Sequence, residues 1–299
     1  MKSSEIKIKT KDGTDISAML YNPDENAKAV VVLSHGFGEH SGSYKEIIER
    51  FNQANYACVI FDQRGHGSFS GKSPEERSKL LGVILNYQDF LDDIYIILGE
   101  IKQKMPDIPV ILYGHSMGGN IVANYLLTHD QSNQSNQSDI SCAVLESPWL
   151  GLYKELNPFV VFIAKILGNI SPNFTIINKL PASDVTGDPE KVKDYDDPLY
   201  HNRISFRMFS GIKKACTYVI NNASKLNIPI YLAYAKNEKI VSNPAIQKFI
   251  KTSGKNVTVK EYESCHAIHN DVVREEYYRD VIAYLDKNCS SVYNNYNKS

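Results

Sequence analysis

The segment Gly114–Gly118 places a serine hydroxyl between two glycines, in the order Gly-His-Ser-Met-Gly. The apolar run 108–113 before it predicts a buried strand, and residues 119–127 after it predict a helix. A serine on a sharp turn between strand and helix is exposed on a strained backbone, which the flanking glycines allow. We therefore predict that Ser116 is a nucleophile. The alternative is that this segment is a glycine-serine turn with a purely structural role.

A serine hydroxyl reacts poorly at neutral pH and needs an adjacent base, which an acid must orient. Two predicted strands, 228–234 and 257–262, are followed by loops that carry Glu238 and His266. We predict that His266 is the base and that Glu238 fixes its tautomer and stabilises its cation.

Two other residues compete for these roles. His269 comes three residues after His266 and borders the last predicted helix, so we expect it to pack or to support the site. Glu146 ends another predicted strand and could supply a carboxylate from that side. Aspartate is the commoner acid at such sites, so the residue type does not single out Glu238. Glu146 therefore remains an alternative.

Acyl transfer also needs hydrogen-bond donors where the oxyanion develops. The Met117 N–H stands at the start of the helix after the serine, where the helix dipole favours negative charge. A second donor is expected from the loop after an early strand, and the N–H of Phe37 fits that place. His115, beside the nucleophile, is expected to line the pocket as a polar residue rather than to act as the base.

The segments that position these residues alternate between strands and helices. Polar and apolar residues alternate over 5–10 and 15–21, which predicts an antiparallel hairpin. Continuous apolar runs at 29–33 and 56–61 predict parallel strands, and apolar spacing over 82–105 predicts one long helix. The fold class is therefore α/β, with a mostly parallel, doubly wound sheet that binds ligands at the carboxyl ends of its strands.

The alternation stops after the strand that ends near Glu146, and this predicts an inserted helical cap. Within it, residues 159–167 contain Lys165 as the one polar residue, which fits a core helix or a lid helix that faces lipid. The polar repeat 131–138 predicts a mobile surface loop. The predicted parts are a first core segment 1–149, the cap 150–203, a second core segment 204–289 and a disordered tail 290–299.

The length, net charge and cysteine pattern of the chain exclude several classes of partner and cofactor. The chain has 299 residues and a net charge of −1, so we expect no nucleic-acid partner. Its five cysteines form no Cys-x-x-Cys motif, and we expect neither a metal nor another cofactor. No secretory leader or membrane span is apparent, so a cytoplasmic location is expected.

Several segments together resemble the monoacylglycerol lipase and lysophospholipase branch of the α/β-hydrolases. The resemblance covers about residues 5–287 and includes 180–183, 192–195, 197–199 and 228–230 in the cap and the second core segment. The segments that carry it most clearly are His35–Gly42, Asp62–Gly67, Gly114–Gly119 and Tyr262–His269.

This resemblance implies an α/β-hydrolase fold and a triad in the chain order serine, acid, histidine, with Ser116, position 238 and His266. It also implies oxyanion N–H groups from Phe37 and Met117, and a cap that meets membranes and admits an acyl chain. The residues implied to contact the headgroup are Glu39, His115 and Tyr195.

The chain departs from that family at two positions. Position 238 is glutamate where the family usually has aspartate, so the geometry of the acid must adjust. Position 43 is serine where monoacylglycerol lipases typically carry an arginine near the glycerol end. The second departure leaves lysophospholipids and general esters open as substrates.

We therefore predict a serine hydrolase that cleaves esters of single-chain acyl lipids, monoacylglycerol or lysophospholipid, through an acyl-enzyme. The alternatives are a general carboxylesterase or thioesterase, a peptidase, and a binding protein on the same fold. A dinucleotide-binding oxidoreductase is disfavoured, because Gly36-Phe-Gly38 lacks a third glycine at position 41.

Overall fold

The computed structural model describes residues 2–10, 12–68, 73–129, 140–178 and 180–296, with side chains to residue 289. Within this part, no helix is both long enough and apolar enough to cross a membrane. The polar repeat predicted at 131–138 lies outside the described residues.

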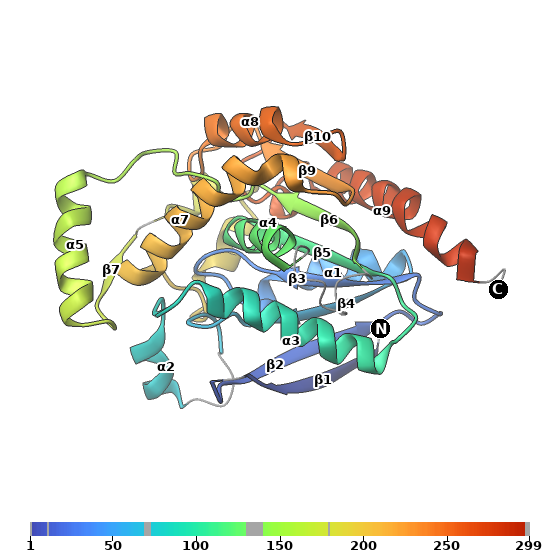
Figure 1. Cartoon of the computed structure of the whole chain (residues 1–299), viewed down its shortest axis with the longest axis horizontal. Coiled ribbons are helices and arrows are strands. Elements are labelled where there is room, and N and C mark those ends of the chain that lie inside the picture. The colour runs from blue at the N-terminus through green and yellow to red at the C-terminus, as the bar shows by residue number, and fades with distance from the viewer. Residues whose placement is uncertain (1, 11, 69–72, 130–139, 179, 297–299) are drawn as a thin grey trace.

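An eight-stranded sheet runs through the molecule in the order β1-β2-β4-β3-β5-β6-β9-β10 (Figure 1). β1 pairs antiparallel with β2, and β2 pairs antiparallel with β4, whereas the remaining neighbours are parallel. This arrangement confirms the predicted mostly parallel sheet with an N-terminal antiparallel hairpin. The strands are β1 (Lys2–Lys9), β2 (Asp15–Asn22), β3 (Ala29–Ser34), β4 (Tyr56–Phe61), β5 (Val110–His115), β6 (Ile140–Glu146), β9 (Ile230–Ala235) and β10 (Val257–Tyr262).

Helices cover both faces of this sheet and make two hydrophobic cores. The central strands β3, β4 and β5 are buried at every residue, which is why each is apolar almost throughout. One core contains side chains of α3 (Gln88–Lys104), α4 (Met117–His129), α7 (Phe206–Asn222) and α8 (Asn243–Thr252); the other contains side chains of α1 (Lys45–Gln53) and α9 (Arg274–Tyr296).

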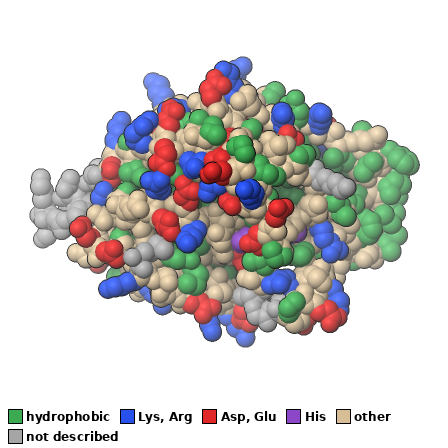
Figure 2. Space-filling model, turned by 180° about the vertical axis from the view of Figure 1, so that it is seen from behind, with side chains coloured by type: hydrophobic (Ala, Val, Ile, Leu, Met, Phe, Trp, Pro, Cys, Tyr) green, Lys and Arg blue, Asp and Glu red, His purple; other side chains and the backbone are tan. Residues whose placement is uncertain are grey.

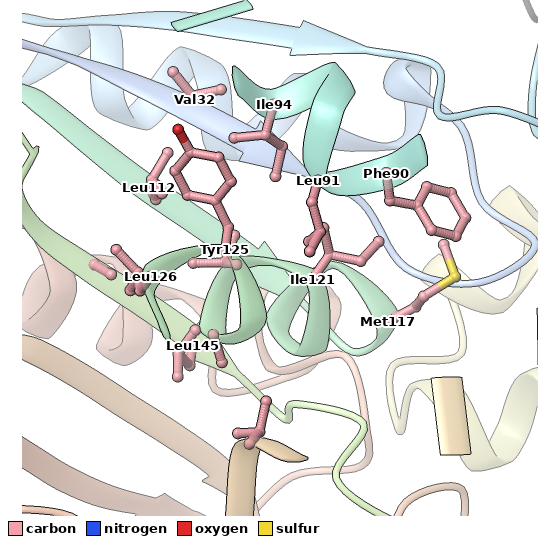
Figure 3. Packing of buried hydrophobic residues seen from close by; sticks show 14 of the residues in the cluster. Val32, Phe90, Leu91, Ile94, Leu112, Met117, Ile121, Tyr125, Leu126 and Leu145 are labelled. Atoms are coloured by element: carbon pink, nitrogen blue, oxygen red, sulfur yellow. The ribbon is translucent and has the colours of Figure 1, made fainter. Parts of the chain in front are cut away.

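Helix α4 directly follows Ser116 and is buried on nearly all sides, from Met117 to Leu127. In Figure 3, Met117 lies beside Phe90 of α3, and Tyr125 lies over the strands of the sheet. A helix enclosed between a sheet and neighbouring helices has few alternative positions. This packing therefore fixes the turn that precedes α4.

Between β6 and α7 the chain adds a set of elements that do not join the large sheet. β7 pairs antiparallel with β8 to form a separate two-stranded sheet. These elements occupy the segment that we predict as a cap. They are α5 (Pro158–Ile170), β7 (Thr175–Ile177), α6 (Ala182–Val185), the 3-10 helix η3 (Lys191–Asp196) and β8 (Arg203–Ser205).

Helix α5 stands at one end of the molecule and exposes most of its apolar side chains (Figures 1 and 2). Only Ala164 and Gly168 of this helix are buried. A Cβ at Gly168 would lie 2.8 Å from the Cβ of Phe206, so this glycine lets α5 approach α7 closely. The interpretation of residues 159–167 as a core helix is therefore wrong.

The helix predicted over 82–105 begins only at Gln88. Gly82 has a φ of +70°, its N–H donates to the carbonyl of Gly65, and its carbonyl accepts from Ser205 at the end of β8. A Cβ at Gly82 would lie 1.8 Å from the carbonyl oxygen of Arg203. The chain at Gly82 therefore packs directly against β8. The helical spacing of apolar residues in the sequence does not reveal this contact.

Two further boundaries differ from the prediction. A short helix, α2 (Pro74–Leu80), forms before Gly82 on a capping box made by Ser73 and Glu76. At the other end, α9 continues to Tyr296, beyond residue 290, where the sequence predicted a disordered tail to begin.

Candidate active site

Ser116 lies on the sharp turn between β5 and α4, with a φ of +52°. A Cβ at Gly114 would lie 2.4 Å from the carbonyl oxygen of Gly118, and a Cβ at Gly118 would lie 1.9 Å from that of Ser34. Both positions therefore require glycine. The strained serine and the close approach together form a nucleophile elbow.

Hydrogen bonds hold the backbone of Ser116 on both sides. Its N–H donates to the carbonyl of Glu146 at 2.9 Å. Its carbonyl accepts from the N–H of Trp149 at 2.8 Å and from that of Asn120 at 3.1 Å. The serine is thus tied to β6, to the chain after β6 and to the first turn of α4.

His266 and Glu238 meet at the carboxyl ends of β10 and β9, as their positions after these strands predict. The Nδ1 of His266 lies 2.7 Å from Glu238 Oε2. The other carboxylate oxygen of Glu238, Oε1, accepts from the N–H groups of Ile240 and Val241 at 2.8 and 3.1 Å. The Glu238 carboxylate is therefore held by backbone N–H groups on one oxygen and faces the His266 ring with the other, the arrangement expected of an orienting acid.

The charge state of this pair follows from its surroundings. Burial disfavours the His266 cation, but the carboxylate of Glu238 outweighs this effect and raises the pKa of His266 above its usual value. Burial likewise acts against the Glu238 anion, yet the His266 ring and the two backbone N–H groups lower the pKa of Glu238. The pair therefore combines an ionised acid with a strengthened base.

Ser116 and His266 line the same cavity, which has a volume of about 730 Å³. The residues predicted to contact a headgroup, Glu39, His115 and Tyr195, line it as well. The wall toward α5 and the β7–β8 sheet is largely apolar, although Lys154, Asn178 and Asn202 also line the cavity. This wall includes Leu152, Leu156, Val160, Ile176, Ile177, Ile204 and Phe209.

The two predicted oxyanion donors lie next to the serine in the fold. Met117 is the first residue of α4, and its side chain points into the core (Figure 3). Phe37 lies in the loop after β3 and lines the cavity. Because Gly118 packs against the carbonyl of Ser34, this loop and the elbow are in contact.

Glu39 enters the cavity from the loop after β3 and is firmly held. Its Oε2 accepts from the N–H of Gly36 at 2.8 Å and from the hydroxyl of Tyr44 at 2.7 Å. Its Oε1 lies 3.7 Å from Nε2 of His115. Burial lowers the pKa of His115 to about 4, so this ring is neutral at physiological pH.

The two alternative residues, His269 and Glu146, bind each other. Nδ1 of His269 lies 2.9 Å from both carboxylate oxygens of Glu146. Neither residue lines the cavity that contains Ser116. The structure thus places Ser116 and His266 at one cavity, with Glu238 behind His266 and 2.7 Å from its Nδ1, whereas the alternative pair binds within itself.

Donor atoms of His115, Glu146 and His269 lie within 4.8 Å of one another, a spacing at which three such groups could hold a metal ion. The carboxylate of Glu146 is already engaged, however, by His269 and by the hydroxyl of Tyr113. We therefore interpret this cluster as a hydrogen-bonded ion pair.

Sequence reasoning missed several partners that complete these sites. Tyr44, Tyr113 and Tyr277 hold the buried carboxylates, and Trp149 holds the carbonyl of Ser116. Tyr113 comes directly before the Gly114–Gly118 turn. The hydroxyl of a tyrosine on a buried strand needs a hydrogen-bond partner, so the sequence does contain a signal for this contact. Tyr277 comes from a distant helix, and no local pattern indicates its contact.

A serine on a strand–helix elbow, with an acid and a histidine on later loops of a mostly parallel sheet, defines an α/β-hydrolase. Residues 25–272 match the Hydrolase_4 family model, described as "Serine aminopeptidase, S33", and the chain belongs to this family.

The chain is similar to lipases within this family. It is 27% identical to the "Monoacylglycerol lipase" of Mycolicibacterium smegmatis, over 91% of this chain and 93% of the relative. The crystal structure of the Paleococcus ferrophilus monoacylglycerol lipase has a TM-score of 0.76 and 27% identity, covering 96% of this chain and 100% of that one.

A third relative is much longer than this chain. It is an "Uncharacterized abhydrolase domain-containing protein" of Dictyostelium discoideum, 28% identical over 98% of this chain. The chain spans 30% of the length of that relative.

Proposed function

We propose that this chain is a serine esterase that cleaves the carboxylic ester of single-chain acyl lipids. The observation that carries the proposal is the cavity of about 730 Å³ that Ser116 and His266 share, with Glu39 and His115 among its polar lining residues and a largely apolar wall. The hydrogen bond from His266 to Glu238 completes a serine-histidine-acid arrangement. The similarity to monoacylglycerol lipases supports the same reaction.

In the first half of the reaction, Ser116 Oγ attacks the ester carbonyl carbon while Nε2 of His266 takes the hydroxyl proton. The bond from Nδ1 to Glu238 leaves Nε2 available for this proton and stabilises the resulting cation. Collapse of the tetrahedral intermediate breaks the ester C–O bond. His266 then gives its proton to the departing alcohol, which leaves an acyl-enzyme on Ser116.

In the second half, water attacks the acyl carbon and gives a proton to His266. The C–O bond to Ser116 then breaks, the serine recovers the proton, and the fatty acid departs. The N–H groups of Met117 and Phe37 are the proposed donors to the oxyanion in both halves. Each such donor contributes about 100- to 1,000-fold to kcat in acyl-transfer enzymes.

The shape of the cavity supports a lipid with one acyl chain and a small headgroup. The apolar wall along the cap accommodates the acyl chain, and the end near Glu39, His115 and Tyr195 offers hydrogen-bonding groups to the headgroup. The Glu39 carboxylate is buried and its pKa is lowered, so a phosphate beside it would be repelled. This favours a monoacylglycerol over a lysophospholipid.

The segment 150–203 is the proposed cap over this cavity, and α5 is its proposed lipid-facing helix. Phe159, Phe162 and Ile170 are exposed at 69%, 57% and 76%, and hydrophobic side chains gather at that end of the molecule (Figure 2). Helices with such a face bind at the interface of a bilayer. We accordingly propose a cytoplasmic enzyme that contacts membranes peripherally.

A panel of substrates tests this function. The purified chain is assayed on 1-oleoylglycerol, oleoyl-lysophosphatidylcholine, p-nitrophenyl butyrate and leucine p-nitroanilide, with Ser116→Ala as the control. We expect hydrolysis of the esters, fastest on oleoylglycerol, and none by the variant. Cleavage of the anilide alone would indicate an aminopeptidase, and inactivity on the whole panel would indicate a binding protein.

A further inference from the structure

The Glu146–His269 ion pair lies behind the proposed catalytic residues and has no role in the reaction described above. The carboxylate of Glu146 is fully buried at the end of β6. Burial disfavours the anion, but the rings of His269 and His115 outweigh it and hold the pKa of Glu146 at about 2. Burial disfavours the His269 cation, but the same carboxylate outweighs it and raises the pKa of His269, which favours the ion-paired form.

Stability alone is a weak explanation for such a pair. Removing two charges from water costs free energy that their attraction offsets only in part. An apolar pair of similar volume is often as stable or more stable at such a position. The geometry of Glu146 indicates a more specific role.

Residue 146 connects the two sides of the active site. Its backbone carbonyl accepts the N–H of Ser116 at 2.9 Å. Its side chain accepts the N–H of His269, also at 2.9 Å. His269 lies in the short 3-10 helix η5 (Ile268–Asn270), which directly follows the segment that carries His266.

The other contacts of this segment come from several different elements. The ring of Tyr44 stacks on that of His269, and the ring of His115 lies 4.9 and 5.0 Å from those of His266 and His269. The carbonyl of His269 accepts from the hydroxyl of Tyr278 on α9, at 2.6 Å. The N–H of Ala267 donates to the carbonyl of Val185 in the proposed cap, at 2.8 Å. Among the hydrogen bonds described, those to Glu146 tie this segment to β6, the strand that pairs with β5 beside the nucleophile.

We propose that the Glu146–His269 pair is a positioning pair, which sets the distance between the base His266 and the nucleophile Ser116. This proposal rests on the proposed function. Neither member lines the main cavity, so neither contacts the substrate directly, and the pair acts through His266.

Two conservative variants test the proposal. Glu146→Gln keeps the shape and an acceptor for the N–H of His269 but removes the charge. His269→Asn keeps a donor near the position of Nδ1 but removes the ring. Because a displacement of about 1 Å from the productive geometry can cost about 100-fold, we expect each variant to lose about 10- to 100-fold in kcat, with KM within about twofold.

A double-mutant cycle and a matched control complete the kinetic test. If the two residues act as one unit, the double variant loses about as much as either single variant. Asp93→Asn is the control, because Asp93 is an equally buried carboxylate paired with Arg64 at 2.7 Å, outside the main cavity. We expect this control to lower the Tm and to leave kcat per labelled active site unchanged.

A second measurement does not depend on ester hydrolysis. Amide hydrogen exchange, followed by mass spectrometry, reports the mobility of peptides that contain residues 263–270. We expect exchange in this segment to accelerate at least about tenfold in Glu146→Gln and His269→Asn, and not in Asp93→Asn.

The two measurements separate the possible failures. Wild-type protein that hydrolyses nothing contradicts the proposed function, while the exchange experiment still decides the positioning role. Unchanged exchange at 263–270, or a kcat within twofold of wild type for both variants, would overturn the positioning role.

Discussion

Replacing Glu238 by glutamine tests the role of the acid most sharply. In the structure, Glu238 Oε1 accepts two backbone N–H groups, and Oε2 faces Nδ1 of His266. A glutamine has one carbonyl oxygen, which the N–H groups of Ile240 and Val241 would retain. Its amide NH2 would then face Nδ1 and force the His266 tautomer that carries the proton on Nε2.

That tautomer cannot accept the proton of Ser116, so the base is lost although the ring stays in place. An acid-to-amide change of this kind lowers kcat by about 10⁴-fold in a serine-histidine-aspartate enzyme. This corresponds to about 5.4 kcal/mol of lost transition-state stabilisation. Glu238→Asp keeps the charge with a shorter side chain, and we expect a loss of only about 10- to 100-fold.

The assay compares kcat/KM on p-nitrophenyl butyrate at pH 8, normalised to the concentration of folded protein. The Tm of each variant provides the control for folding. Activity of Glu238→Gln within tenfold of wild type would refute the assignment of Glu238 as the orienting acid.

Three further predictions follow from the same geometry. Because the pKa of His266 is raised and the base must be neutral, kcat/KM should fall as the pH drops through a value above 6.5, and a midpoint below 6 would contradict this. Gly118→Ala places a Cβ 1.9 Å from the carbonyl of Ser34, so it should destabilise the fold by about 3 kcal/mol in urea unfolding; an unchanged midpoint would show that the elbow can relax. The double variant Phe159→Ser and Phe162→Ser should weaken binding to phospholipid vesicles at least tenfold and leave hydrolysis of p-nitrophenyl butyrate intact; unchanged binding would rule out α5 as the lipid-facing helix.

The parts of the site that local sequence signals predicted are those that depend on a strand end. Ser116 and Glu238 follow apolar strands, His266 follows the partly exposed strand β10 with its two valines, and parallel strands bring their carboxyl ends to one edge of the sheet. For this reason, the sequence predicts that these loops meet at one edge of the sheet, and no knowledge of side-chain packing is needed.

The remaining features depend on contacts between distant segments. The Glu146–His269 pair joins residues 123 positions apart, and no periodicity encodes that contact. The segment after Gly82 turns away from a helix because it meets β8, which lies more than a hundred residues later. The apolar spacing of α5 fits a buried helix and a lipid-facing helix equally well, and only its exposure at the end of the molecule excludes the buried helix.

The central claim is that Ser116 is the nucleophile that carries the acyl group. Mass spectrometry of the intact chain after treatment with a fluorophosphonate tests it directly. We predict one adduct, mapped to the peptide that contains Ser116, on the wild-type chain and none on Ser116→Ala. Equal labelling of the variant, or an adduct mapped to another residue, would contradict the claim.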